Sequence, residues 1–162
     1  MTAMESDKSR IERLRAIVET LQNEHSEGVK HVQELAEAAH TIQRNGFNAA
    51  AFEQIARSIR WINTGVRMHM QAEEQHLFPA IRAENPRLFE QLHNEHRELG
   101  TAFTQLMNTV FDVEEGTLRG SILQELVTAT DNVVRLLEKH MQEENAALFP
   151  LLQNMLNASS ET

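Results

Sequence analysis

Apolar residues recur along the chain at steps of three, four or seven, which is the spacing of an amphipathic helix. The stretches that carry this pattern are residues 8–44, 48–84, 86–112 and 122–156. No stretch alternates apolar and polar residues with period two. The pattern therefore predicts an all-α protein of four long helices, followed by a polar tail from Asn157 that frays.

Glycine and proline mark the breaks between and within these helices. Asn45-Gly46 ends the first helix, because glycine readily takes the left-handed conformation that caps a helix. Pro86 suits the first turn of the third helix, where its missing N–H needs no partner. Pro79 and Pro150 each remove one backbone hydrogen bond and predict a kink in the second and fourth helices.

One motif occurs twice, with an offset of 71 residues. His69 and Glu73 stand four residues apart, as do His140 and Glu144, and Leu-Phe-Pro follows each pair. Residues four apart project from the same face of a helix about one turn from each other. Each pair therefore has the spacing of two ligands to one metal site.

The same offset relates two further histidines, His25 and His96, each at the end of an Asn-Glu-His triplet. His25 and His69 lie equally far from the first turn, and His96 and His140 lie equally far from Leu118 in the third connection. Because a helix rises about 1.5 Å per residue, two residues equally far from a turn lie at the same height. An up-down-up-down four-helix bundle, built from two duplicated helical hairpins, would bring these side chains into one layer of its core.

Four imidazoles and two carboxylates in one apolar layer would be very costly to bury without a cation. The predicted metal ligands are His25, His69, Glu73, His96, His140 and Glu144. Two central carboxylates among four imidazoles suit two metal ions, with the glutamates bridging and the histidines terminal. Carboxylate and imidazole without sulfur favour iron or manganese, with zinc or cobalt as substitutes. With a solvent-derived bridge, these ligands fill about ten of roughly twelve positions on two octahedral ions. At least one position is left for water, a fifth protein ligand or a diatomic gas.

Composition narrows the class of protein. The 162 residues predict one domain, 1–162, with its core in about residues 10–155. A net charge of −9 without a basic stripe argues against binding to nucleic acid. Absence of cysteine excludes thiolate ligands and a cysteine nucleophile. The polar N-terminus and the lack of a long apolar run predict no membrane span, so the expected compartment is the cytoplasm.

The order His, His-x-x-x-Glu, His, His-x-x-x-Glu resembles the signature of hemerythrin-like (HHE) cation-binding domains, over nearly the whole chain. The resemblance implies a non-heme di-iron centre, two iron ions with an oxo or hydroxo bridge, in an up-down bundle; manganese or zinc are substitutes. It also implies a protein that binds or senses a diatomic ligand, dioxygen or nitric oxide. The alternatives are an enzyme that acts on nitric oxide, peroxide or ferrous iron, and a structural bundle with incidental metal.

Oxygen-carrying hemerythrins have a fifth histidine one turn before the third-helix ligand, and they end in His-x-x-x-x-Asp. Here the nearest equivalent is His93, three residues before His96, and the last motif ends in glutamate. His93 and His76 are candidates for a further ligand, whereas His31 and His40 are expected in solvent.

A ferritin-like arrangement would instead use Glu-x-x-His pairs. Glu73-x-x-His76 and Glu90-x-x-His93 have this spacing. Neither pair recurs at the 71-residue offset, and both lie near one turn of the chain. The repeat therefore favours the hemerythrin-like set.

Apolar residues near the ligand histidines are predicted to form a dry wall over an open coordination position, although plain core packing would account for them equally well. They are Val29, Val32, Ile62, Val66, Phe103, Val133 and Leu137. Four glutamates close to the ligands in sequence are candidates for proton delivery, but exposure to solvent is the expected role of each. They are Glu24, Glu74, Glu95 and Glu143.

Overall fold

The computed structural model describes residues 7–117 and 119–160, and its regular elements are all helices. The long helices are α1 (Asp7–Asn45), α2 (Ala49–His76), α4 (Pro86–Glu114) and α5 (Ile122–Glu143). The shorter elements are α3 (Phe78–Glu84), the π-helical turn η1 (Glu144–Leu148) and α6 (Phe149–Ser160). No strand occurs within the described residues, which confirms the all-α prediction.

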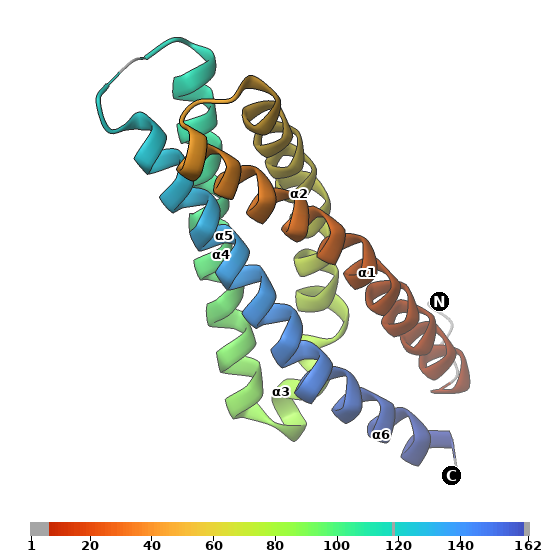
Figure 1. Cartoon of the computed structure of the whole chain (residues 1–162). Coiled ribbons are helices and arrows are strands. Elements are labelled where there is room, and N and C mark those ends of the chain that lie inside the picture. The colour runs from red at the N-terminus through yellow and green to blue at the C-terminus, as the bar shows by residue number, and fades with distance from the viewer. Residues whose placement is uncertain (1–6, 118, 161–162) are drawn as a thin grey trace, which may run out of the picture.

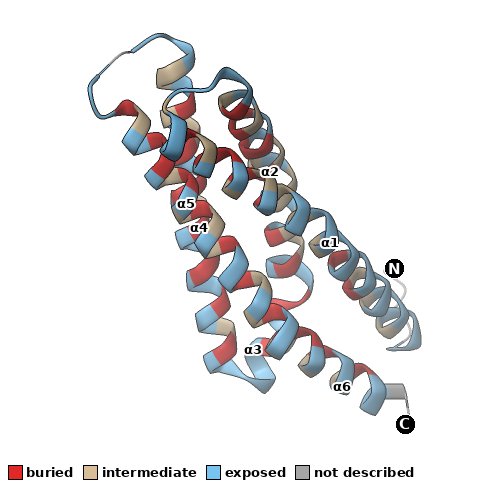
Figure 2. Cartoon of the chain, in the orientation of Figure 1, coloured by how far each residue is buried: buried red, intermediate tan, exposed pale blue. Residues whose placement is uncertain are grey.

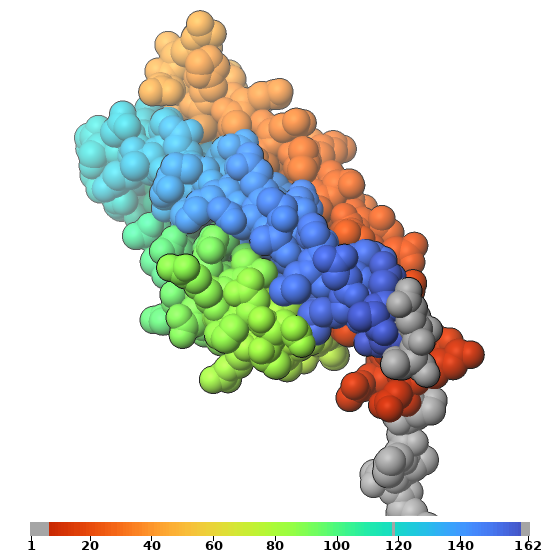
Figure 3. Space-filling view, turned by 90° about the horizontal axis from the view of Figure 1, so that it is seen from below, coloured from red at the N-terminus to blue at the C-terminus, as the bar shows by residue number. Residues whose placement is uncertain are grey.

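The four long helices form one elongated bundle in which consecutive helices run in opposite directions (Figure 1). α1 packs against α2 and α5, and α4 packs against the same two helices, so the four close a ring around a common core. The start of α1 and the end of α6 lie at the same end of the bundle, where α6 lies between α1 and the turn from α3 to α4 (Figure 3). The predicted up-down-up-down bundle is confirmed.

Helix ends follow the predicted breaks closely. Gly46 has a φ of 78° directly after α1, a conformation that glycine adopts without strain. The side chains of Asn48 and Asn85 accept hydrogen bonds from the first backbone N–H groups of α2 and α4. The tail prediction was wrong, because α6 continues through Asn157 to Ser160. Leu118, the predicted midpoint of the third connection, lies outside the described residues.

The two Leu-Phe-Pro segments distort their helices in different ways. In the first half a single residue, Leu77, interrupts the helix and separates α2 from α3, although its N–H still bonds to the Glu73 carbonyl. In the second half the helix widens into η1, where the Phe149 N–H bonds to the Glu144 carbonyl five residues earlier. Pro79 and Pro150 cannot donate a backbone hydrogen bond, which is one reason why a regular α-helix does not pass through either segment.

Buried residues recur along the inward faces of the helices (Figure 2). Their apolar side chains form two separate clusters along the bundle, and a polar layer lies between them. On α2, Met70 belongs to the cluster on the side of the α1–α2 turn, Leu77 belongs to the other, and Glu73 lies between. On α4, Leu99 and Leu92 flank His96 in the same way. The fold therefore sets a layer of buried polar groups across the middle of an apolar core.

Candidate metal centre

All six predicted ligand residues meet in this polar layer. They form two groups, one of His25, His69, Glu73 and Glu144 and one of Glu73, His96, His140 and Glu144. Within each group the potential ligand atoms all lie within 4.8 Å of one another. The two glutamates belong to both groups, as the sequence predicted for bridging carboxylates.

Each glutamate faces one histidine of each group. Glu73 Oε1 lies 2.9 Å from His69 Nε2, and Glu73 Oε2 lies 3.1 Å from His96 Nε2. Glu144 Oε2 lies 3.3 Å from His25 Nε2, and Glu144 Oε1 contacts His140 Nε2. Each carboxylate thus directs one oxygen to each group, which is the geometry that a carboxylate bridge between two cations requires.

The residues fit a cation because their polar atoms are buried and poorly paired. Glu73 and Glu144 are completely buried, yet Glu73 Oε1 and both oxygens of Glu144 accept no hydrogen bond from the described residues. His69 Nε2, which faces Glu73, is also buried without a hydrogen-bond partner there. Since buried polar groups in folded proteins are almost always satisfied, these converging atoms are suited to hold a positive ion.

Electrostatics within the layer support the same conclusion. Burial raises the pKa of Glu73 well above the usual glutamate value, and the Glu144 carboxylate raises it further. Burial also opposes charge on Glu144, but the adjacent His140 outweighs it and holds the pKa of Glu144 well below its usual range. Burial opposes charge on His140 as well, yet Glu144 and its other acidic neighbours raise the pKa of His140 to about 10. Protons held by this layer would be displaced by a metal cation.

Three of the four histidines are held at their outer nitrogen by a carboxylate. Glu24 Oε2 lies 2.6 Å from His69 Nδ1, and Glu95 Oε2 lies 2.8 Å from His140 Nδ1. These two pairs are related by the 71-residue offset. Glu24 is exposed to solvent as expected, although it also contacts a ligand histidine. The expected exposure was wrong for Glu95, which is only 6% exposed.

A third carboxylate completes this set, and here the two halves differ. Glu74 Oε1 lies 2.8 Å from His96 Nδ1, so this exposed glutamate also contacts a ligand histidine. Its counterpart in the second half is Asn145, and the corresponding histidine, His25, has a buried Nδ1 without a hydrogen-bond partner among the described residues. Such outer contacts fix ring orientation and strengthen a histidine as a ligand. The two groups are therefore chemically unequal.

Each copy of the Leu-Phe-Pro segment packs its phenylalanine against a ligand histidine, and both phenylalanines belong to the apolar cluster that contains Leu77 and Leu92. Phe78 stacks on His96 with a centroid distance of 4.9 Å, and Phe149 meets His25 edge-on at 5.2 Å. The repeat relates these two pairs as well. Each copy of the segment therefore packs a phenylalanine against a predicted ligand imidazole.

The remaining histidines stay outside both groups. His93 is exposed and stacks on Phe89, and His76 is exposed at the end of α2. Neither is brought to the centre. His40 is exposed as expected, but His31 is half-buried and stacks on Trp61 at 3.9 Å, so its expected exposure was wrong.

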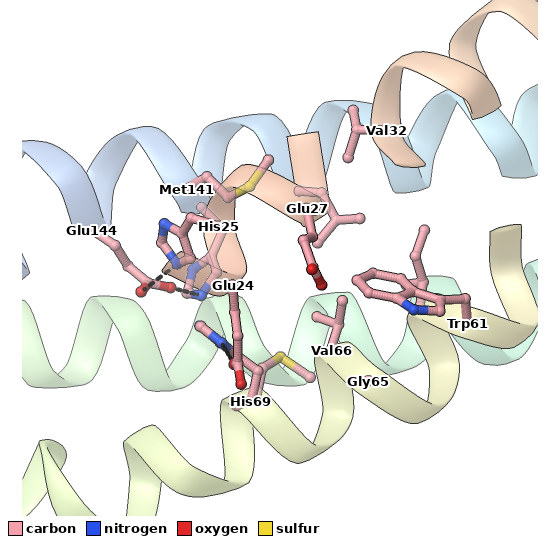
Figure 4. Close-up of a pocket in the computed structure, with 15 residues that line it drawn as sticks. Glu24, His25, Glu27, Val32, Trp61, Gly65, Val66, His69, Met141 and Glu144 are labelled. Atoms are coloured by element: carbon pink, nitrogen blue, oxygen red, sulfur yellow. Dashed lines mark hydrogen bonds and ion pairs between the residues drawn. The ribbon is translucent and has the colours of Figure 1, made fainter. Parts of the chain in front are cut away.

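A cavity of about 150 Å³ adjoins one side of the layer (Figure 4). It is bounded by residues of α1, α2 and α5, and it reaches His25, His69, His140 and Glu144. The predicted wall is present in part, since four of its residues line this cavity: Val32, Ile62, Val66 and Leu137. The prediction was wrong for the other three: Val133 and Phe103 lie in the apolar core, and Val29 is 44% exposed.

Fold and site together define an all-α bundle protein with a buried His/Glu cation site. The family model described as "Hemerythrin HHE cation binding domain" matches residues 16–152, so the chain belongs to that family. No curated protein and no solved structure matches the chain. Within the described residues, no helix has both the length and the apolar composition needed to cross a bilayer.

Proposed function

We propose that this chain holds two iron ions between Glu73 and Glu144 and binds or senses dioxygen or nitric oxide there. The observation that carries the proposal is that each buried glutamate faces one histidine of each ligand group. Imidazole and carboxylate ligands without sulfur suit iron, and manganese or zinc can substitute. Such a pair of ions supplies an exchangeable coordination position and, for iron, a change of oxidation state.

The chain's own residues would control how the centre behaves. His25, His69, Glu73 and Glu144 would hold one ion, and the two glutamates with His96 and His140 would hold the other. Glu24, Glu74 and Glu95 would keep three imidazoles in the orientation and protonation state that binding requires. The cavity beside His25 and His69 would exclude bulk water from the centre and admit only small molecules.

The test is an anaerobic measurement of metal and spectrum. Metal is quantified in the purified protein, which is then reduced and mixed with dioxygen or with nitric oxide. About two irons per chain, with a new charge-transfer band that disappears when the gas is removed, is the expected result. Fewer than two metal ions per chain would overturn the two-metal proposal. Repeated consumption of the gas, of peroxide or of ferrous iron would instead favour an enzyme.

A further inference from the structure

The cavity beside the metal centre is larger than a diatomic ligand needs. Its volume is about 150 Å³, whereas a water molecule, similar in size to a diatomic gas, takes up about 30 Å³ of a liquid. An apolar cavity of roughly this size can hold benzene. Figure 4 shows the cavity extending from the imidazoles of His25 and His69 to the indole of Trp61.

Comparison of the two halves of the chain explains why the space exists on this side. Gly28 and Gly65 line the cavity from α1 and α2. At the 71-residue offset, their counterparts are Leu99 and Leu136. Leu99 is almost fully buried in the core, and Leu136 packs against it. The second half thus fills with leucine side chains the positions that the first half leaves empty.

Neither glycine is required by the backbone. Only Gly46 and Gly116 have a positive φ among the described glycines, so Gly28 and Gly65 have ordinary helical conformations. A Cβ at Gly28 would come no closer than 3.6 Å to Met141 Sδ, which is an ordinary contact.

A Cβ at Gly65 would likewise lie 3.7 Å from the nearest atom of Trp61. Glycine is the least favourable residue in a helix interior after proline. No turn and no close approach demands either glycine, so what each contributes here is open volume in the cavity.

The lining indicates which molecules fit. Ile62, Val66 and Leu137 give apolar walls, and Trp61 offers an aromatic face. Glu27 is exposed at the surface of α1, and its carboxylate points into the cavity toward Trp61 (Figure 4). An acidic group at the entrance, an indole behind it and a protein net charge of −9 all favour a cation over an anion.

We infer that this cavity binds a small organic amine, with its apolar body between Val66 and Leu137 and its ammonium group at Glu27. The inference rests on the proposed function only in placing a metal pair at the inner end of the cavity. A bound amine would thus lie next to the position where a diatomic ligand binds.

The test uses three probes of similar size, namely benzylamine, toluene and benzoate, titrated into the purified protein and followed by calorimetry and by the chemical shifts of the Trp61 indole. Benzylamine is expected to bind about tenfold more tightly than toluene, and benzoate is expected not to bind. Glu27→Gln should bring benzylamine to the level of toluene while leaving toluene unchanged. Equal binding of all three probes, or of none, would overturn the inference.

Filling the cavity supplies the second test. The double variant Gly28→Ala/Gly65→Ala should weaken benzylamine and toluene about tenfold and raise the melting temperature, because alanine favours the helix. Gly100→Ala changes a helix glycine outside the cavity and should leave probe binding unchanged. Probe binding that survives in the double variant would contradict the inference.

Metal content is measured in the same samples, so that the amine site and the metal centre are tested independently. A wild-type protein with two metal ions per chain that binds neither benzylamine nor toluene would refute the cavity site alone. Fewer than two metal ions would refute the proposed centre, whereas benzylamine binding that requires Gly28, Gly65 and Glu27 would still establish the amine site.

Discussion

Replacing Glu95 by glutamine tests whether the acidic partners of the histidines help to hold the metal ions. Glu95 Oε2 lies 2.8 Å from His140 Nδ1, and the buried carboxylate also accepts a hydrogen bond from Gln91. Glutamine keeps the size of the side chain but removes its charge. The loss of such an outer partner lowers metal affinity by about 10–100-fold, which corresponds to about 1.4–2.7 kcal/mol. Because Glu95 is shielded from water, we expect the upper part of this range.

Glu24 offers a matched comparison from the other half of the repeat. It makes the equivalent contact to His69, at 2.6 Å, but its side chain is 48% exposed. Water can take over part of that hydrogen bond, so Glu24→Gln should cost about tenfold in affinity. Glu98→Gln is the control, because Glu98 is exposed and contacts no ligand histidine among the described residues.

The assay removes the metal and titrates zinc or anaerobic ferrous iron back in competition with a chelator of known affinity. The melting temperature of each metal-free variant shows whether the bundle still folds. The expected order of metal affinity is Glu98→Gln equal to wild type, then Glu24→Gln, then Glu95→Gln. Identical affinities in all four proteins would show that these carboxylates do not support the ligands.

Three further predictions concern the bridge, the protons and the cavity wall. The Glu73→Ala variant should bind at least one metal ion fewer per chain, because both ligand groups share this residue. The Glu27→Ala variant is the control and should keep both ions. Equal metal content in the two variants would exclude Glu73 as a bridge. The pKa of His140 rises from 6.5 to about 10 on folding without metal, so its stabilising contribution is complete below pH 6.5 and is lost as the pH rises toward 10. Since a metal ion bound at His140 would displace that proton, the gap in melting temperature between metal-loaded and metal-free protein should widen over this range. A constant gap would contradict the assignment of His140 as a ligand. Val66→Ala and Leu137→Ala should let the reduced protein oxidise faster in air, and unchanged rates would show that the wall does not control access.

The six central residues could be predicted from the sequence because their placement depends only on helix geometry. A spacing of four puts His69 and Glu73 on one face, and equal distances from a turn put His25 and His69 at one height. Neither inference depends on how the side chains pack. The structure brings these residues together for that reason, although the exact turn residues differ slightly from those expected.

The outer carboxylates could not be predicted in the same way, because a helical projection shows one helix and not its neighbour. Glu24 lies on α1 but reaches His69 on α2, and Glu95 on α4 reaches His140 on α5. The sequence did carry a usable signal. Each glutamate precedes a ligand histidine in an Asn-Glu-His triplet and lies 45 residues before the histidine that it contacts.

The interruption at Leu77 and the cavity could not be predicted from the spacing of apolar residues along the chain, because that spacing does not show how side chains pack. Pro79 and Pro150 predict a distortion, but the same Leu-Phe-Pro sequence interrupts one helix and widens the other, so the motif alone does not decide which occurs. In the sequence, the cavity corresponds only to two differences between the halves. At the 71-residue offset, Gly28 corresponds to Leu99 and Gly65 corresponds to Leu136. The repeat predicts the features that the two halves share, whereas the cavity depends on positions at which they differ.

The differences between the two halves fall on the same side of the centre. His25 lacks the outer carboxylate that Glu74 gives to His96, and the cavity opened by Gly28 and Gly65 borders His25. A histidine without an outer partner is the weaker ligand, and a site that borders open space exchanges its other ligands more easily. In the proposed two-metal centre, we therefore expect the ion that His25 and His69 would hold to leave first when a chelator is added. A duplicated hairpin would give two equivalent ions, and these few substitutions would be enough to make one of them the exchangeable one.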